Sequence, residues 1–582
     1  MNFEVGGREF LKDGEPVKLI SASVHYFRNL PDTWDDILDK LVALGCNCVE
    51  TYCAWNMHEK VKGEFDFSGA LDVAEFLRKA QSRGLMAIVR PGPYICAEWE
   101  FGGLPWWIMA EDNINLRCMD EKYIQYFDRY LDKIFDEIRP LLCTNGGPVI
   151  MVQCENEYGY YGDDVHYRNY LRDGYRQRGI DVPLFTSDGS ERKILLDGAI
   201  DGCLPTLNFG SKAKMHYDNL EAEFPGTPRM VMEMWNGWFD EWGDDFHHTT
   251  SVENYVNSVD EALSYGSMNM YMFIGGTNFG FMNGANHGDK YCPHVTSYDY
   301  DALLTESGDV TEKYMAIREV IKKHTGREPV PVPANRPKRA FGRVDFEKRA
   351  SLFDNMDTLS AAVQSKTPLN MEKYGIGYGY IAYTTRLNRR YDDAVLSFDG
   401  IGDRAQVYIN REYIGTVYVN DEKLEITFSA NEGDTLTILC ENMGRTNFGT
   451  KMMRKKGIDG RCMIDDKIHF DWTVYPLPMD NLRKLVYTDA PIEEKAQFYK
   501  ASFDIEEPCD TFLKLEGFGK GFAVLNGFNL GRHWCVGPQR TLFVPASVLK
   551  KGENGLIVFD SDGAQEGCYA LFTDTPELGE GK

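Results

Sequence analysis

The chain has 582 residues, too many for a single hydrophobic core, so roughly two to four domains are expected. Hydrophobic residues make up 43% of the chain and aromatic residues 13%, which is typical of a globular protein rich in ring side chains. The formal net charge of −26 argues against nucleic acid or an anionic membrane as the partner, whereas a neutral ligand such as a sugar is compatible with it.

The first residues of the chain contain neither the basic segment nor the apolar segment of a secretory signal. No run of apolar residues approaches the ~18 to 20 that a membrane span needs. The 14 cysteines follow no repeating frame, and Cys46, Cys48, Cys154 and Cys440 lie in apolar segments. We therefore expect free thiols, no structural zinc and a cytoplasmic location.

Buried strands alternate with amphipathic helices through residues 1–326. After a hairpin-like start, strands are predicted at 17–26, 46–52, 85–90, 149–152, 183–187, 202–207, around Glu233, and at 268–274. Helices are predicted at 30–45, 71–83, 123–142, 165–178 and 251–265. About eight strand–helix units of this size are typical of a (β/α)₈ TIM barrel. The alternative of a doubly wound sheet lacks its Gly-rich phosphate loop after the first strand.

The Pro-rich segment 327–341 is predicted to be an extended linker. Beyond it lie short alternating strands, predicted at 378–387, 394–398, 405–409, 424–428 and 435–440. A weak repeat relates Ile409-Asn410 and Ile414-Gly415 to Leu525-Asn526 and Leu530-Gly531. Two related β-sandwich domains of jelly-roll type, at 342–480 and 481–582, explain this pattern, with packing or strand exchange between them.

Two of the predicted barrel strands end in carboxylates. The apolar run 149–152 leads into Glu155, Asn156 and Glu157, and a second apolar run leads into Glu233. A carboxylate at the end of a buried strand is costly unless it is paired or used in chemistry. Because all strands of a barrel open on the same face, the two strand ends can meet there.

Four further segments are also rich in polar and aromatic residues, at 50–59, 90–99, 275–280 and 296–301. They would surround one barrel mouth with carboxylates, amides, phenols and indoles. Sugars require this mixture, because aromatic faces contact the apolar side of the ring and polar groups bind the hydroxyls. No phosphate loop and no serine nucleophile elbow is present in the sequence.

These six segments resemble, in order and spacing, those of the glycoside hydrolase family 35 β-galactosidases, and the all-β tail is similar at 471–473 and 527–532. The resemblance implies that Glu157 is the acid/base, Glu233 the nucleophile and Asn156 the amide that binds the sugar 2-hydroxyl. It assigns the remaining sugar-pocket positions to Tyr52, Cys96, Ala97, Glu98 and Tyr300. The implied activity is that of a retaining exo-β-galactosidase acting on galactosides or oligosaccharides.

The chemistry itself requires such a carboxyl pair. One acid protonates the glycosidic oxygen while a second carboxylate attacks the anomeric carbon, with a separation near ~5 Å for net retention. Glu157 must hold its proton near neutral pH, and the charge of Glu233 would help it to do so. Two carboxylates suffice for this reaction, so we expect no metal and no organic cofactor.

Other acidic residues receive structural interpretations. Glu155 lies one residue from Glu157, so strand alternation would turn it to the opposite face, where we expect an ion pair. The acidic and imidazole groups of segment 240–248 fit no standard metal spacing, so a solvated loop is favoured.

Trp235 and Trp238 follow the second carboxylate. Trp235 shares a strand face with Glu233, and Gly237 lets the chain turn, so that Trp238 can reach the rim. We expect both indoles to contact the sugar beyond the scissile bond, with capping of the barrel as the alternative for each. Two other functions stay open: an exo-glycosidase for another β-linked sugar such as a glucosaminide, and a non-catalytic carbohydrate-binding protein. The linkage and the oligomeric state, for which a homodimer is one option, are not specified by the sequence.

Overall fold

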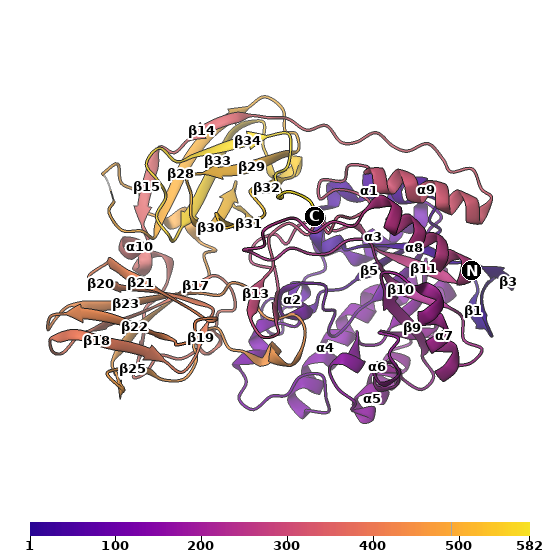
Figure 1. Cartoon of the computed structure of the whole chain (residues 1–582), viewed down its shortest axis with the longest axis horizontal. Coiled ribbons are helices and arrows are strands. Elements are labelled where there is room, and N and C mark those ends of the chain that lie inside the picture. Colours follow the sequence, from indigo (N-terminus) through magenta and orange to yellow (C-terminus); the bar gives the residue numbers. More distant parts are fainter. Residues whose placement is uncertain (491) are drawn as a thin grey trace.

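A computed structural model describes residues 1–490 and 492–582. Figure 1 shows a barrel ringed by helices on the right and two all-β lobes, one above the other, on the left. Among the described residues, none of the helices has the length and apolar composition that crossing a membrane requires.

Within residues 1–490, eight parallel strands close a barrel in the order β10-β11-β4-β5-β6-β7-β8-β9. They are β4 (Ile20–Val24), β5 (Cys48–Tyr52), β6 (Met86–Arg90), β7 (Val149–Gln153), β8 (Leu184–Asp188), β9 (Leu204–Phe209), β10 (Met230–Trp235) and β11 (Ser267–Ile274). Nearly every strand residue is buried, because helices cover the outside and side chains fill the inside. The predicted TIM barrel is confirmed.

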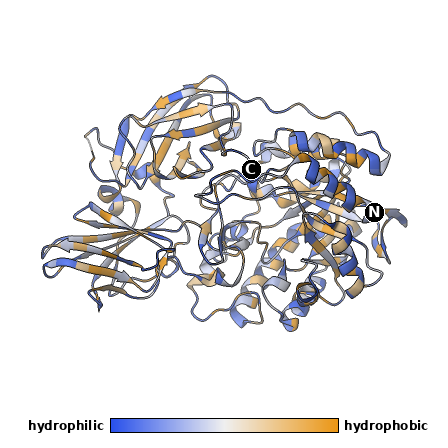
Figure 2. Cartoon of the chain, viewed as in Figure 1, coloured by the Kyte–Doolittle hydropathy of each residue, from blue (hydrophilic) through white to orange (hydrophobic). Residues whose placement is uncertain are grey.

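Helices pack around this barrel (Figure 1). They are α1 (Trp34–Leu44), α3 (Val73–Ser82), α4 (Glu121–Ile138), α5 (Val165–Gln177), α6 (Arg192–Gly198), α7 (Ala213–Glu223), α8 (Val252–Tyr265) and α9 (Glu312–Thr325). They carry hydrophobic and hydrophilic segments side by side, as amphipathic helices do (Figure 2). α1 ends at Gly45, whose φ of 104° is the expected left-handed stop. α6, α7 and α9 lie outside the helices predicted from sequence, and α6 and α7 begin without a side-chain cap.

Small elements complete the barrel domain. The N-terminal hairpin sheet is formed by β1 (Phe3–Gly6), β2 (Glu9–Lys12) and β3 (Glu15–Val17). A one-turn helix, α2 (Trp55–His58), follows β5, and the hairpin of β12 (Ala285–His287) and β13 (Tyr291–Pro293) follows β11. This hairpin lies on the side of the barrel that faces the all-β lobes.

The first all-β lobe is built by residues 363–477. One sheet has the order β16-β27-β17-β23-β20-β21 and the other β22-β18-β25-β26. The strands are β16 (Val363–Ser365), β17 (Tyr380–Arg386), β18 (Tyr391–Phe398), β20 (Arg404–Ile409), β21 (Glu412–Tyr418), β22 (Glu425–Ala430), β23 (Thr435–Glu441), β25 (Cys462–Ile464), β26 (Lys467–Ile468) and β27 (Trp472–Leu477). The short pair β19 (Ile401–Gly402) and β24 (Gly457–Ile458) lies beside them.

The second all-β lobe has sheets in the orders β14-β34-β29-β32 and β15-β28-β33-β30-β31. The strands are β14 (Gly342–Asp345), β15 (Lys348–Ser351), β28 (Gln497–Ile505), β29 (Thr511–Glu516), β30 (Lys520–Leu525), β31 (Phe528–Trp534), β32 (Thr541–Val544), β33 (Gly552–Asp560) and β34 (Tyr569–Thr573). Its first two strands therefore come from residues 342–351, which the expected boundaries had placed in the first lobe. The chain returns to the first lobe through α10 (Leu352–Leu359), which lies between the lobes (Figure 1).

The repeat seen in the sequence corresponds to two equivalent hairpins, β20–β21 and β30–β31. Asn410 and Asn526 occupy the same turn position, with φ of 50° and 52°. Each exchanges two hydrogen bonds with a following strand: Asn410 with Thr435 at 2.9 Å in both directions, and Asn526 with Gly555 at 2.8 and 3.0 Å. Asparagine suits these turns because it tolerates a left-handed backbone and its side chain binds locally.

Polar contacts join the lobes to the barrel. In the 327–341 linker, Arg336 contacts Asp510 of the second lobe at 3.0 Å and Asp32 of the barrel domain at 3.1 Å. Arg532 of β31 donates to the side chain of Asn283 in the barrel domain and to the backbone oxygen of Asn442 in the first lobe. Arg532 of the second lobe thereby contacts both of the other parts of the chain.

Candidate active site

A cavity of about 610 Å³ opens where the barrel strands end. The predicted site residues that line it are Cys96, Ala97, Glu98, Asn156, Glu157, Glu233, Trp235, Trp238 and Tyr300. Tyr52, the remaining one, reaches the site through its hydroxyl group. The structure therefore brings every predicted residue to one place, as a barrel does for the carboxyl ends of its strands.

Glu233 lies in β10 and is 7% exposed. Its Oε1 accepts hydrogen bonds from Arg90 Nη2 at 2.8 Å and from the Tyr52 hydroxyl at 2.7 Å. Its Oε2 accepts from the indole of Trp235 at 3.2 Å. A guanidinium partner and two neutral donors stabilise a negatively charged carboxylate and fix its orientation.

Glu157 follows β7 in a turn, with a left-handed φ of 47°. Its Oε1 accepts a hydrogen bond from the neutral amide of Asn208 at 3.0 Å. Burial, together with the negative charge of Glu233, raises the pKa of Glu157 to about 8. At neutral pH this carboxyl group therefore carries a proton, which a general acid requires.

Asn156 shares its hydrogen-bond partners with Glu233. Its Oδ1 accepts a hydrogen bond from Arg90 at 2.7 Å and lies 3.0 Å from the Tyr52 hydroxyl, and both of these groups also contact Glu233. Its Nδ2 donates to the backbone oxygen of Ile95 at 3.4 Å. The amide and Glu233 are therefore held by shared partners, so their relative position is fixed.

One wall of the cavity is a strained turn, Cys96–Ala97–Glu98. All three residues have left-handed φ values, of 57°, 58° and 50°. Such residues persist only where their surroundings fix them. Arg28 donates to the Ala97 backbone oxygen, and the Gly284 backbone amide donates to that of Glu98 at 2.9 Å.

A cluster of tyrosines faces this turn. The Tyr298 hydroxyl donates to Glu98, and it lies 3.0 Å from the hydroxyl of Tyr271. The Tyr300 ring packs edge-on against Tyr271, with centroids 5.4 Å apart. Burial raises the pKa of Glu98 to about 7. This wall therefore offers hydroxyl groups and a carboxyl group to a polar ligand.

The two tryptophans after Glu233 occupy different positions. Trp235 contacts Glu233 directly, so it supports the carboxylate as well as lining the cavity. Trp238 is 41% exposed and packs edge-on against Trp235, with centroids 5.8 Å apart. A side chain at Gly237 would collide with the backbone oxygen of Tyr300, which explains the glycine between them.

Glu155 forms the expected ion pair, but strand alternation is not what orients its side chain. It lies beyond β7 with a φ of 61°, so it belongs to the turn. Arg117 contacts both of its oxygens, at 2.9 and 2.7 Å, and the Tyr167 hydroxyl donates at 2.9 Å. Glu155 is 2% exposed and does not line the cavity, so its ion pair is structural.

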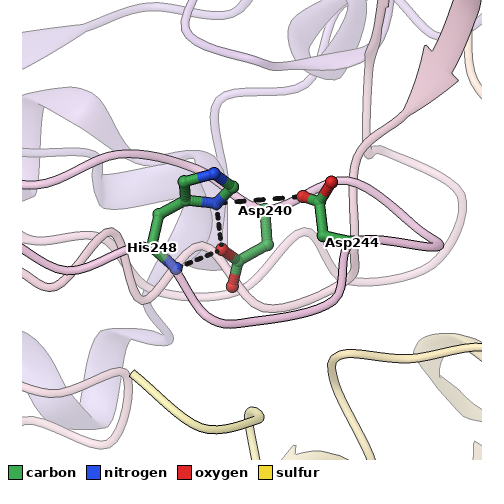
Figure 3. A group of neighbouring side chains, drawn as sticks. All are labelled: Asp240, Asp244 and His248. Atoms are coloured by element: carbon green, nitrogen blue, oxygen red, sulfur yellow. Dashed lines mark hydrogen bonds and ion pairs between the residues drawn. The ribbon is translucent and has the colours of Figure 1, made fainter. Parts of the chain in front are cut away.

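Segment 240–248 is solvated only in part: Gly243 and Asp245 are exposed, whereas Asp240 and His247 are buried. Asp240 is 7% exposed because histidines satisfy its oxygens: His247 at 2.6 Å and His248 at 2.9 Å. Burial alone would lower the pKa of His247, but hydrogen bonds to Asp240 and Asp299 outweigh it and raise the pKa to about 10. Figure 3 shows Nδ1 of His248 joined to the carboxylates of both Asp240 and Asp244. Asp240, Asp244 and His248 each bring one possible ligand atom to within 4.8 Å of the others, and the two aspartates contact the His248 imidazole.

Several residues at the site were not predicted. Arg90 and Asn208 are polar residues at the ends of buried strands, the same signal that identified Glu233, and could have been found from it. Tyr160 and Phe448 line the cavity mouth, with ring centroids 6.0 Å apart. Phe448 belongs to the first all-β lobe, and no local sequence pattern relates it to the barrel.

Comparisons with known proteins cover all three parts of the chain. Residues 9–324 match Glycosyl hydrolases family 35. Residues 368–478 match the first all-β domain of β-galactosidase, and residues 496–554 its galactose-binding domain. The chain is 41% identical to the β-galactosidase of Xanthomonas manihotis over 94% of this chain and 92% of the relative. It is 39% identical to that of Bos taurus, over 97% and 92%, and 38% identical to that of Homo sapiens, over 98% and 89%.

Proposed function

The chain belongs to glycosyl hydrolases family 35, and we propose that it is a retaining exo-β-galactosidase. It removes terminal β-linked galactose from galactosides by double displacement. The observation that carries this proposal is the pair Glu157 and Glu233, which line one cavity in opposite environments: one favours a proton, the other a negative charge.

In the first step Glu157 donates its proton to the glycosidic oxygen while Glu233 attacks the anomeric carbon. The leaving group departs as an alcohol, and galactose becomes esterified to Glu233. Arg90 and Tyr52 both bind Oε1 of Glu233 and so hold the attacking carboxylate in position before the reaction. This preorganisation avoids a reorganisation cost during the step.

The second step uses the same two groups in exchanged roles. Once Glu233 is esterified, its negative charge is gone, so one cause of the raised pKa of Glu157 is removed. The carboxylate of Glu157 then takes a proton from water, which attacks the anomeric carbon and releases galactose. Two displacements at the same carbon give net retention.

The residues that line the cavity support the proposal of an exo-enzyme, with a polar sugar bound at the inner side of the cavity. Glu98 of the Cys96–Glu98 turn offers a carboxyl group there, and Tyr271 and Tyr300 offer hydroxyl groups. At the outer side, Trp238 and Phe448 are 41% and 36% exposed and present ring surfaces. We assign this outer side to the sugar or aglycone beyond the scissile bond, where apolar stacking is suitable.

A reducing compartment such as the cytoplasm suits the cysteines. In the described residues all 14 are unpaired, and most are buried. Such thiols remain reduced where disulfides are not formed. We propose a cytoplasmic location on this basis.

A panel of chromogenic aryl glycosides tests the function. We expect turnover of the β-galactoside and at least ~100-fold lower kcat/KM for the β-glucosaminide and the α-galactoside. Glu233→Gln serves as the inactive control. Preference for the glucosaminide would assign another exo-glycosidase, and sugar binding without turnover at any pH would indicate a carbohydrate-binding protein.

A further inference from the structure

The segment that follows β23 of the first all-β lobe enters the barrel domain. Residues 442–447 are almost completely buried, with Arg445 and Asn447 both at 0% exposure. Backbone contacts tie the segment to the β12 hairpin, including a bridge between Thr446 and Ala285 and a hydrogen bond of 3.0 Å from Asn447 to Ala285. The lobe therefore inserts part of its chain behind the cavity wall.

Arg445 anchors this segment. Its guanidinium contacts Glu100 of the barrel domain at 2.8 Å and Glu372 at the edge of the first lobe at 2.8 Å. All three charges are fully buried. Because charge-assisted hydrogen bonds in a buried setting are strong and directional, the segment has a fixed position two residues before Asn447.

The side chain of Asn447 uses both ends of its amide at the cavity wall. Nδ2 donates to Sγ of Cys96 at 3.7 Å, and Oδ1 accepts from Nε2 of His294 at 3.0 Å. Burial lowers the pKa of His294 to about 3, so this imidazole is neutral. A side chain at Gly284 would come within 2.5 Å of Asn447 Oδ1, so glycine is required for the close approach.

Cys96 begins the strained turn that forms the inner wall of the cavity. Arg28 restrains Ala97, and the backbone of Gly284 restrains Glu98. The Asn447 side chain contacts Cys96, the first residue of the turn. Its backbone oxygen accepts a hydrogen bond from the hydroxyl of Tyr94, which lies just before the turn. Three consecutive left-handed residues require such restraints on every side.

We propose that Asn447 of the first all-β lobe is a positioning residue for the sugar pocket, which shapes the Cys96–Glu98 turn that receives the galactose ring. The inference rests on the proposed function, because it assumes that the turn faces the sugar. The Asn447 side chain acts through Cys96, while its backbone oxygen binds Tyr94, and the barrel without the lobe would lack this support.

The test compares Asn447→Ala with Asn442→Ala in the full chain. Asn442 is the matched control: it is equally buried in the same segment, but its amide contacts Gly377 and Gly444 and not the turn. We measure the inhibition constant of galactose, KM and kcat for an aryl β-galactoside, and the melting temperature. Assays are performed well below the melting temperature of each variant.

For Asn447→Ala we expect the inhibition constant of galactose and KM to rise about tenfold, with a smaller change in kcat. Asn442→Ala should lower the melting temperature by a similar amount and leave galactose inhibition within about twofold. In a Cys96→Ala background the effect of Asn447→Ala should shrink, because the two residues act as a pair. If the alanine variant does not fold, Asn447→Ser is measured in its place, because its hydroxyl group can still bind His294.

Equal changes in galactose inhibition for the variants at 447 and 442, or a full effect of Asn447→Ala in the Cys96→Ala background, would overturn the proposal. The failure of the proposed function would be seen separately. It would show as absent β-galactoside turnover in the unmodified chain, whereas this proposal concerns only the ratio between variant and unmodified chain.

Discussion

Arg90 Nη2 lies 2.8 Å from Oε1 of Glu233, whereas Oε1 of Glu157 accepts its hydrogen bond from the neutral amide of Asn208 at 3.0 Å. This difference distinguishes the two carboxyl groups. A cation beside Glu233 favours its charged form, while burial and a neighbouring negative charge favour the protonated form of Glu157. These surroundings support the proposed assignment of acid and nucleophile.

The pKa of Glu157 predicts the pH dependence of activity. Because the acid must be protonated in the free enzyme, kcat/KM should fall as pH rises through about 8. Glu233→Gln removes the neighbouring charge, so the pKa of Glu157 should decrease in that variant. Carbon-13 NMR titration of labelled glutamate measures it directly. An unchanged or higher pKa in Glu233→Gln would contradict the proposed coupling.

Glu155→Gln tests the structural interpretation of that residue. The substitution leaves Arg117 buried without its charged partner, so we expect a loss of about 3 kcal/mol in the stability of the barrel, measured by urea unfolding. Asp136→Asn is the control, because its pair with Arg139 is exposed and should contribute less than ~1 kcal/mol. A loss in Glu155→Gln no larger than in the control would refute the interpretation.

Trp238→Ala tests the outer side of the cavity. If the exposed indole stacks on the second sugar, disaccharide hydrolysis should lose about 1–3 kcal/mol of transition-state stabilisation. An aryl galactoside with a good leaving group should lose less. Trp235→Ala should impair both substrates, because Trp235 contacts Glu233. Phe470→Ala, at an exposed ring outside the cavity, is the control. Equal losses on both substrates for Trp238→Ala would show that the indole is only packing.

The cysteines are expected to be free thiols, which a labelling experiment can test. Alkylation in denaturant without reductant, followed by intact-mass analysis, should label nearly all 14 cysteines. Pairs that become reactive only after reduction would place the protein in an oxidising compartment instead.

The sequence predicts the barrel well because its strands are buried on both faces and appear as apolar runs. It also predicts which carboxylates lie at the mouth, since Glu157 and Glu233 each follow such a run. The orientation of Glu155 was expected from strand alternation, yet it depends on a left-handed turn. Backbone reversals of this kind depend on tertiary contacts, here with Arg117, which the local sequence does not reveal.

Long-range associations account for what the sequence did not predict. Asn447 reaches the cavity wall, and Phe448 the cavity mouth, from a lobe that begins far beyond the barrel, so neither has a neighbouring motif. Likewise β14 and β15 pair with strands from the end of the chain. The sequence of a short strand does not specify which sheet the strand will join.

Azide rescue tests the roles of Glu157 and Glu233 most directly. In Glu157→Ala the nucleophile is intact, so azide should attack the galactosyl-enzyme and give a β-galactosyl azide. In Glu233→Ala azide replaces the nucleophile in a single displacement, so the product should be the α-galactosyl azide. Proton NMR of the anomeric centre distinguishes the two products. The same anomer from both variants, or the reverse assignment, would contradict the account.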